Sequence, residues 1–332
     1  MPTATSFIRT FTLLVFFSLC ASSASAESVQ QVSIGLSSNS FPSSSTRLVK
    51  EMGLFEKHGL EVKIVPMDNA SVASMGLLSG SVDFTAAGPS DVVIAQSKEQ
   101  PVVVVANLYR GFSGVLVVRK TVAEKLRTSA SAPVAERLKA LDGLTIAAPS
   151  ATATSLLTLQ SSAQTAGSKP KYVYMSQPAM VTALKAGAID GFIASSPFYA
   201  SSVIEGSGVV WLNGPKGDFP AESMPPSTVT LNAKSQFIRA HPDVVKRVNA
   251  AFEEFASTVA QDPKQVRAAA ARVFRDLDAK TLDLICETEL ASLNTRPFSL
   301  DDARREIAFV KSGMTNNHMQ RDLEPRQLLY RE

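Results

Sequence analysis

Short loops rich in serine, threonine and asparagine are the most suggestive chemical feature of this 332-residue sequence. Each follows a short apolar run and precedes a segment whose apolar residues have helical spacing. The N–H groups of a helix N-terminus, with hydroxyl and amide side chains beside them, favour an anionic group such as a carboxylate, a sulfonate or nitrate. The same side chains also serve as helix caps, so a binding role requires several loops to meet at one place. The predicted ligand-binding residues are Ser38, Asn39, Ser40, Phe41, Ala70, Ser71, Gly88, Pro89, Ser90, Arg110, Ser150, Thr152, Ser195 and Ser196.

The residue patterns of common enzymes and metal sites are missing from the sequence. Its histidines, His58, His241 and His318, lie on separate segments, and no pair has the spacing of metal ligands. Neither a Gly-x-Ser-x-Gly nor a Gly-x-x-x-x-Gly-Lys motif occurs, and Gly111-Phe112-Ser113-Gly114 is one residue short of the first. The 33 basic and 30 acidic residues are interspersed, which argues against nucleic acid as a partner. We therefore expect a protein that binds a small molecule without a cofactor or a metal and is not an enzyme.

Strand-like runs alternate with helical patterns along most of the chain, as in α/β proteins with largely parallel sheets. A first stretch predicts strands at 32–36, 61–65, 82–86 and 102–106, and helices at 45–57, 71–78 and 90–97. A second stretch predicts strands at 145–148, 172–175, 191–194 and 209–212, and helices at 152–164 and 179–186. Residues 213–226 are rich in glycine and proline and predict a loop that leads into a crossover. From Ala233 onward the pattern is almost wholly helical, and these helices are expected to pack as a buttress on the first lobe.

An internal repeat indicates that one design is built twice. The segment Leu77-Leu78-Ser79-Gly80-Ser81-Val82-Asp83 matches Leu184-Lys185-Ala186-Gly187-Ala188-Ile189-Asp190, 107 residues further on. In both copies a helix ends at a glycine, an apolar-aspartate pair starts a strand, and a small-residue loop with proline follows. In open α/β sheets, ligands bind beyond the carboxyl ends of the strands. Two facing copies would therefore form a cleft between two lobes.

The first 26 residues have the pattern of a secretory signal peptide. Arg9 precedes the apolar segment 11–19, and Ala24-Ser25-Ala26 suits a signal peptidase, so cleavage is expected near Ala26 and the mature protein in the periplasm. The bulky Leu19 before Cys20 disfavours lipidation. The mature chain keeps only Cys286, so we expect no intramolecular disulfide and a packing role for this thiol.

The stretch from Gly53 to Asp83 resembles the sulfonate-, nitrate- and thiamine-precursor-binding proteins of ABC transporters. The similar residues are Glu51-Met52-Gly53-Leu54-Phe55-Glu56-Lys57-His58-Gly59-Leu60-Glu61-Val62, followed by Ser79-Gly80-Ser81-Val82-Asp83. The resemblance implies a type II periplasmic-binding-protein fold, with two Rossmann-like lobes joined by two hinge strands and a helical C-terminal buttress. By position, the family's ligand loops would fall on Ser38, Asn39, Ala70, Ser71, Gly88, Ser90, Ser150, Thr152 and Ser195. A tryptophan platform of some relatives has no counterpart, because Trp211 lies in a predicted strand.

This plan predicts a first lobe at 27–112, a second lobe at 113–223, and a return to the first lobe with the C-terminal helices at 224–332. The hinges are expected near Arg110–Val115 and Ser223–Thr230, and Arg110 is the one cation close to a predicted crossing. The resemblance implies a monomer that closes on a small solute and docks on the permease subunits of an ABC importer. A subunit that senses ligand for a membrane receptor would use the same cleft. A thiamine-pyrimidine synthase of related fold would need a cysteine-rich iron motif, which Cys286 alone cannot supply.

Overall fold

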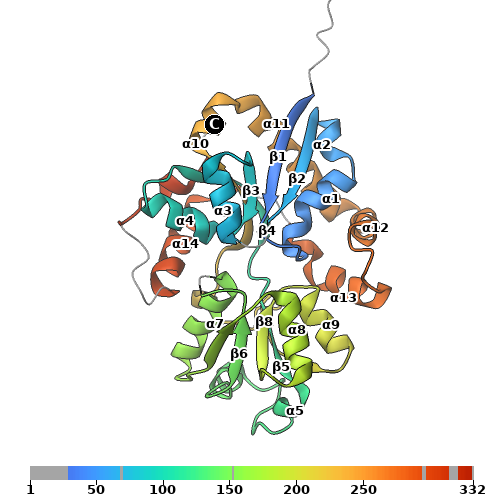
Figure 1. Cartoon of the computed structure of the whole chain (residues 1–332), viewed down its shortest axis with the longest axis vertical. Coiled ribbons are helices and arrows are strands. Elements are labelled where there is room, and N and C mark those ends of the chain that lie inside the picture. Colours follow the sequence, from blue (N-terminus) through green and yellow to red (C-terminus); the bar gives the residue numbers. More distant parts are fainter. Residues whose placement is uncertain (1–28, 68–69, 152, 294–296, 314–320, 331–332) are drawn as a thin grey trace, which may run out of the picture.

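Two mixed sheets, one in each lobe, form the framework of the protein (Figure 1). The computed structural model describes residues 29–67, 70–151, 153–293, 297–313 and 321–330. The first sheet has the strand order β2-β1-β3-β10-β4 and the second the order β7-β6-β8-β5-β9. The first contains β1 (Gln30–Leu36), β2 (Leu60–Pro66), β3 (Phe84–Ala87), β4 (Val102–Arg110) and β10 (Ser227–Lys234). The second contains β5 (Val115–Arg119), β6 (Thr145–Ala148), β7 (Lys171–Tyr174), β8 (Gly191–Ala194) and β9 (Gly208–Asn213).

The two sheets have equivalent topologies. Strand β1 pairs in parallel with β2 and β3, as β6 does with β7 and β8. In each sheet a strand that enters from the other lobe then pairs antiparallel: β10 with β3 and β4, and β5 with β8 and β9. These two strands follow the crossings, and they make each sheet mixed where the sequence predicted largely parallel pairing.

The glycine-aspartate repeat has the same structural role in both lobes. Gly80 and Gly187 end their helices with φ of +83° and +74°, a conformation that favours glycine. The aspartate that follows binds the neighbouring parallel strand: the N–H of Ser33, in the middle of β1, donates to Asp83 Oδ2 at 2.8 Å, and the N–H of Thr145, at the start of β6, donates to Asp190 Oδ2 at 3.0 Å. Each repeat thus joins a helix end to two neighbouring parallel strands.

Helices flank both sheets, and the helix expected over 45–57 is divided in two. Gly53 has a left-handed φ of +70° and separates α1 from α2, because an α-helix cannot continue through that conformation. Helices of the first lobe are α1 (Ser45–Glu51), α2 (Leu54–Lys57), α3 (Ala70–Ser79) and α4 (Pro89–Ser97), with the 3-10 helix η1 (Pro42–Ser44) before them. Helices of the second are α5 (Lys120–Ala123), α6 (Val134–Lys139), α7 (Thr154–Thr165), α8 (Gln177–Ala186) and α9 (Phe198–Ile204).

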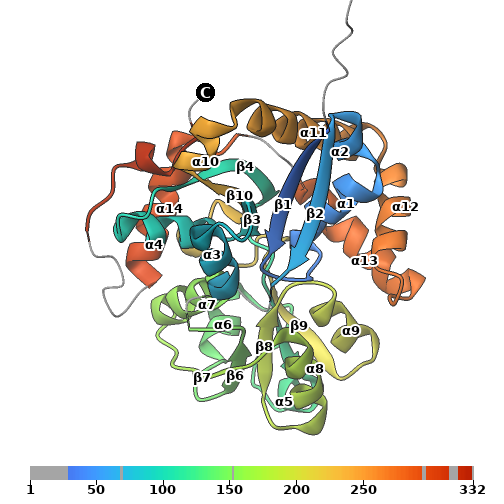
Figure 2. The ribbon, with the colours of Figure 1, turned by 45° about the horizontal axis from the view of Figure 1, so that its top comes forward.

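The C-terminal helices buttress the first lobe and also reach the second (Figure 2). They are α10 (Ser235–Ala240), α11 (Pro242–Gln261), α12 (Pro263–Val273), α13 (Ala279–Glu289) and α14 (Leu300–Gly313), with 3-10 helices η3 (Leu290–Ser292) and η4 (Pro325–Leu328). A further 3-10 helix, η2 (Ala221–Ser223), comes before β10. Helix α11 buries its apolar face on the first lobe, where Phe252 meets Phe55 edge to face at 5.6 Å between ring centroids. Helix α13 contacts α9, and α14 contacts both α4 and α7. The buttress therefore touches both lobes, whereas the sequence placed it on the first lobe alone.

Cys286 lies in the core on α13, where burial raises the pKa of its thiol to about 11. Because the reactive form of a cysteine is the thiolate, this thiol is inert near neutral pH and serves packing, as expected.

Among the residues that the structure describes, no helix combines the length and the apolar character needed to cross a membrane.

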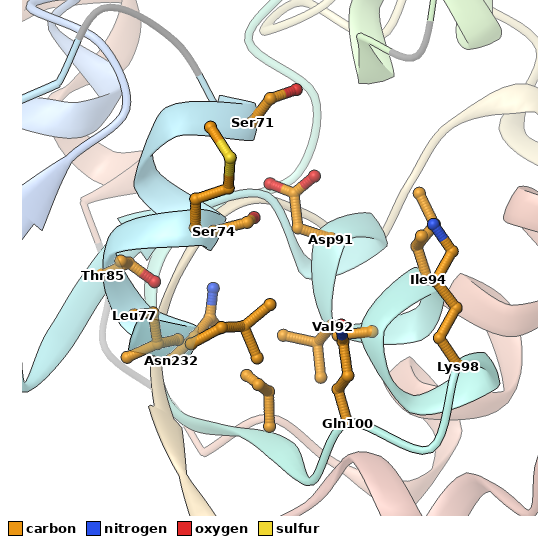
Figure 3. A pocket seen from close by; sticks show the side chains of 14 residues that line it. Ser71, Ser74, Leu77, Thr85, Asp91, Val92, Ile94, Lys98, Gln100 and Asn232 are labelled. Carbon is orange, nitrogen blue, oxygen red and sulfur yellow. The ribbon is translucent and has the colours of Figure 1, made fainter. Parts of the chain in front are cut away.

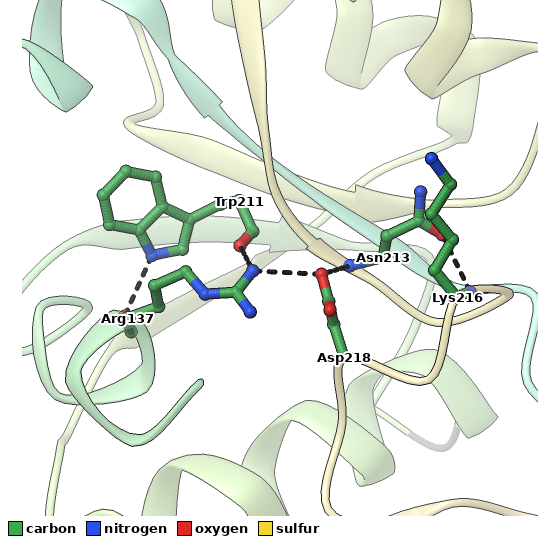
Figure 4. A network of polar contacts seen from close by, with 5 residues as sticks. All are labelled: Arg137, Trp211, Asn213, Lys216 and Asp218. Atoms are coloured by element: carbon green, nitrogen blue, oxygen red, sulfur yellow. Dashed lines mark hydrogen bonds and ion pairs between the residues drawn. The ribbon is translucent and has the colours of Figure 1, made fainter. Parts of the chain in front are cut away.

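The chain crosses between the sheets twice, at 111–114 and at 214–226. The second crossing is anchored to the second lobe by the buried Arg137 of α6 (Figure 4). Arg137 Nη1 donates to the Trp211 carbonyl at 2.8 Å and to Asp218 Oδ2 at 3.0 Å. The Trp211 indole N–H donates to the Arg137 carbonyl at 2.9 Å, and the Asn213 N–H donates to Asp218. Trp211 is thus a buried core residue of β9 and does not form a platform for a ligand.

We expect Asp218→Asn to lower the free energy of unfolding by about 2 kcal/mol, because the buried Arg137 would lose its ionic partner. Chemical denaturation of the purified chain measures this loss. Glu136→Gln, an exposed change on the same helix α6, is the matched control and should cost little. Equal stabilities of the two variants would show that the Arg137 contact does not hold the crossing.

Candidate functional site: a cavity between the lobes

A cavity of about 480 Å³ lies between the two lobes. The first lobe and its hinge contribute mostly hydroxyl-bearing and small residues: Ser37, Ser38, Asn39, Ser40, Ser43, Ala70, Gly88, Ser90, Asp91, Ser113 and Thr228. The second lobe contributes Pro149, Ser150, Ala153, Thr154, Ser155, Ser176, Gln177, Pro178, Ser195 and Phe198. A solute in this space would touch both lobes at once.

Four helices begin at the cavity, two from each lobe. Helices α3 and α4 start at Ala70 and Pro89 on one side, and α7 and α8 start at Thr154 and Gln177 on the other (Figure 2). Each N-terminus carries free backbone N–H groups and a partial positive charge. The two halves therefore direct helix ends of the same polarity toward the cavity.

Hydrogen bonds across the cavity wall hold its hydroxyl groups in place. Ser38 Oγ accepts from the Ser40 N–H at 3.1 Å. At the hinge, the hydroxyls of Ser113 and Ser195 lie 3.2 Å apart and join the first crossing to the second lobe. Thr228 Oγ1 links the start of β10 to the first crossing, since it donates to the Gly111 carbonyl at 2.7 Å and accepts from the Ser113 N–H at 3.0 Å.

Eight of the residues predicted from the sequence line the cavity: Ser38, Asn39, Ser40, Ala70, Gly88, Ser90, Ser150 and Ser195. Five others lie elsewhere: Phe41, Ser71, Pro89, Arg110 and Ser196. The side chains of Phe41 and Ser196 are fully buried, and Phe41 packs 5.7 Å from the Phe274 ring. Arg110 is exposed at the end of β4, which runs four residues beyond the predicted end at Ala106. Thr152 lies outside the described residues.

Sequence reasoning missed several lining residues, among them Asp91, Thr154 and Gln177. The internal repeat could have revealed Gln177, because the same 107-residue spacing relates it to Ala70 and both begin helices at the cavity. Asp91 follows the predicted Ser90 directly but carries a charge that the hydroxyl-based argument did not consider.

Two acidic residues lie at and behind the wall formed by α4. Asp91 is half-buried, and burial raises the pKa of its carboxyl to about 6. Glu306 of α14 is fully buried behind it, accepts a hydrogen bond from Ser90 Oγ at 2.5 Å, and has its pKa raised by burial to about 8. At neutral pH Glu306 is therefore mostly protonated and Asp91 mostly ionised.

A further buried carboxyl, Glu289 of α13, connects the two lobes near the hinge. It accepts hydrogen bonds from the Tyr109 hydroxyl of β4 at 2.9 Å and from the Tyr199 hydroxyl of α9 at 3.3 Å. Burial raises the pKa of Glu289 to about 7. Nearby, the Phe41 N–H donates to the Ser196 carbonyl at 2.9 Å, a backbone hydrogen bond between the lobes. These contacts join the lobes from outside the cavity lining.

A second cavity, of about 340 Å³, opens between α3 and α4 in the first lobe (Figure 3). Its wall combines apolar residues such as Leu77 and Val92 with Ser71, Ser74 and Asn232. Asp91 lines both cavities, and its carboxyl points toward the part of α3 that carries Ser71 and Ser74 (Figure 3). Within the described ranges, no group of three His, Cys, Asp or Glu side chains could hold a metal ion.

Solved structures with the same fold include a sulfonate-binding protein and a nitrate-binding protein. The alkanesulfonate-binding protein SsuA from Xanthomonas axonopodis pv. citri, bound to MOPS, has a TM-score of 0.73 and 18% identity, with 92% of this chain and 99% of that chain covered. The nitrate-binding protein NrtA from Synechocystis PCC 6803 has a TM-score of 0.66 and 13% identity, with 88% of this chain and 84% of that chain covered. Two lobes, two crossings and a cavity between them thus define a periplasmic-binding-protein fold.

Comparison of the amino-acid sequence with known proteins identifies the family of this protein. A candidate binding protein of Brucella abortus (strain 2308) is 25% identical over 237 residues, which cover 70% of this chain and 68% of that one. The NMT1-like family matches residues 25–274, about three quarters of the chain, and the protein belongs to this family.

We expect the fold to lose stability as the pH rises from about 5 to about 8. The pKa values of Glu289 and Glu306 are raised by burial, so folding favours their protonated forms. This contribution is complete below their unfolded pKa and disappears as the pH passes their folded pKa values, at about 1.4 kcal/mol for each pKa unit. The melting temperature measured between pH 5 and pH 8.5 tests the trend.

The variant Glu289→Gln/Glu306→Gln should flatten that pH profile, because glutamine resembles the protonated acid and does not titrate. Glu124→Gln, an exposed change on the loop after α5, should leave the profile as it is. A wild-type melting temperature that rises over this pH range would contradict the assignment of these two glutamates.

Proposed function

We propose that this protein is an extracytoplasmic solute-binding protein that captures a small polar solute between its lobes and delivers it to an ABC importer. The cavity lined from both lobes is the observation that carries this proposal. The relatives support it, because the two solved structures are named for alkanesulfonate and nitrate binding, and the nitrate-binding protein is described as periplasmic. The role requires binding and release only, so we assign no catalytic residue.

The solute would be held by loops at strand ends, with its anionic group, such as a carboxylate, sulfonate or nitrate, near helix N-termini. We propose contacts from Ser38, Asn39, Ser40, Gly88, Ser90, Ser150 and Ser195, which line the cavity. The lobes would rotate about the crossings at 111–114 and 214–226, and the solute would favour the closed state by binding both lobes. We place the second lobe at 113–223, between these hinges.

The cellular setting follows from the same proposal. The segment 1–26, which lies outside the described residues, would direct export and be removed near Ala26. The mature protein would act as a monomer in the periplasm and present its closed form to the permease subunits.

A thermal-shift screen of sulfonates, nitrate, carboxylates and thiamine precursors tests the proposal directly. A solute that binds only the folded protein must raise the melting temperature, by an amount that grows with its concentration. Purified protein that converts a solute without any partner would contradict the assignment as a binding protein.

We expect Gly88→Leu to weaken solute binding at least about tenfold, because the added side chain would fill space that the closing lobes need. A Cβ at this position would already lie 3.5 Å from Thr154 Oγ1 of the opposite lobe. The backbone at Gly88 has φ −66° and ψ 145°, which any residue adopts, so the fold should survive. Isothermal titration with a solute found in the screen measures the change, and Ser129→Leu on an exposed loop is the control. Unchanged affinity of the Gly88 variant would place the solute outside this cavity.

A further inference from the structure

The charge of the cavity wall is unusual for a site that binds a simple anion. Among the described residues that line it, Asp91 is the only one with an ionisable side chain, and neither lysine, arginine nor histidine is present. An anion near Asp91 would meet a carboxylate without a neighbouring cation to offset it. At an effective dielectric constant near 20, a like charge about 5 Å away weakens binding by roughly two orders of magnitude.

The polarity of the cavity differs between its two sides. Helices α7 and α8 of the second lobe have no acidic residue in their first turns, so their positive ends face the cavity uncompensated. In the first lobe, α4 carries Asp91 in its first turn, which reverses the sign of the charge there. The α4 end of the first lobe thus favours positive charge, whereas the N-termini of α7 and α8, and that of α3 beside α4, favour negative charge.

Ser90 strengthens the acceptor character of the α4 side. Its hydroxyl proton is donated to Glu306, so the Ser90 oxygen has only lone pairs left for a solute. Asp91 takes part in no ion pair with any described residue that the structure records. Ser90 and Asp91 therefore present adjacent acceptors that lack a positively charged partner.

A purely structural role for Asp91 explains only part of this arrangement. An acidic residue in the first turn of a helix stabilises that helix through its partial charge, as Asp243 does at the exposed start of α11. Asp91 differs because it is half-buried and lies between two cavities. A carboxylate removed from water without a cation is costly, and a bound positive group would remove that cost.

From this geometry we propose that the solute is zwitterionic: it carries a protonated amine that Asp91 and Ser90 bind, and an anionic group that faces the N-termini of α7 and α8. The inference rests on the proposed function and narrows its solute class. Asp91 then selects for the amine, while the helix N-termini select for the acid.

Matched solute pairs that differ in a single group test the proposal. Taurine is compared with isethionate, and β-alanine with hydracrylate, since in each pair a hydroxyl replaces the amine and the acid stays the same. Isothermal titration of the wild-type protein should give at least a tenfold preference for the amine of any pair that binds. Because this comparison uses the unmodified chain, it holds even if a variant folds poorly.

Asp91→Asn should reduce that preference to less than about threefold while it leaves the affinity for the hydroxyl member similar or higher. Asp243→Asn is the matched control, because it also removes an aspartate from the first turn of a helix that begins with a proline, but on the exposed end of α11. The control should retain the full preference for the amine.

The outcomes separate this inference from the proposed function. Binding of isethionate, hydracrylate or nitrate as tight as that of the amines would overturn the inference and support the proposed function. An amine preference that survives in Asp91→Asn would also overturn the role of Asp91. If neither these pairs nor any solute of the screen bound, both proposals would be wrong.

Discussion

Parallel pairing at the centre of each sheet is the constraint on which the binding site depends. Asp83 and Asp190 bind Ser33 of β1 and Thr145 of β6, and so fix the register of these strands against β3 and β8. Once the register is fixed, the carboxyl ends of the central strands and the N-termini of the following helices lie at one edge. Two such edges facing each other produce a cavity surrounded by small polar residues. The position of the cavity thus follows from two short segments that never touch it.

Structural elements that depend on neighbouring residues in the chain could be predicted from the sequence. The helix-glycine-aspartate repeat, the strands that follow it and the serine-rich loops at their ends were all recognisable, because they depend on neighbours in the chain. The loop containing Ser38 to Ser40 does line the cavity, yet the adjacent Phe41 packs against Phe274 more than 200 residues away. Such a contact is set by tertiary packing, and no local pattern distinguishes it from an exposed aromatic.

Charged residues were the hardest to place from sequence for the same reason. Arg110 was expected near the ligand, but β4 extends through it and leaves it exposed. Glu289 and Glu306 occur in helical patterns where glutamate is usually solvated, yet both are fully buried because α13 and α14 pack against the lobes. Their burial depends on how helices from the end of the chain fold back across both lobes, which composition and spacing do not reveal.

In the proposed binding role, the hydrogen bonds of Glu289 with Tyr109 and Tyr199 have a consequence for the selectivity among solutes. These hydrogen bonds join both lobes and lie outside the cavity lining. They would therefore change the free-energy difference between the open and closed forms by the same amount for every solute. A substitution there would multiply all dissociation constants by one common factor and leave their ratios unchanged. In the proposed solute-binding role, the overall affinity and the selectivity among solutes would therefore be set by residues at separate positions, and each could change without the other.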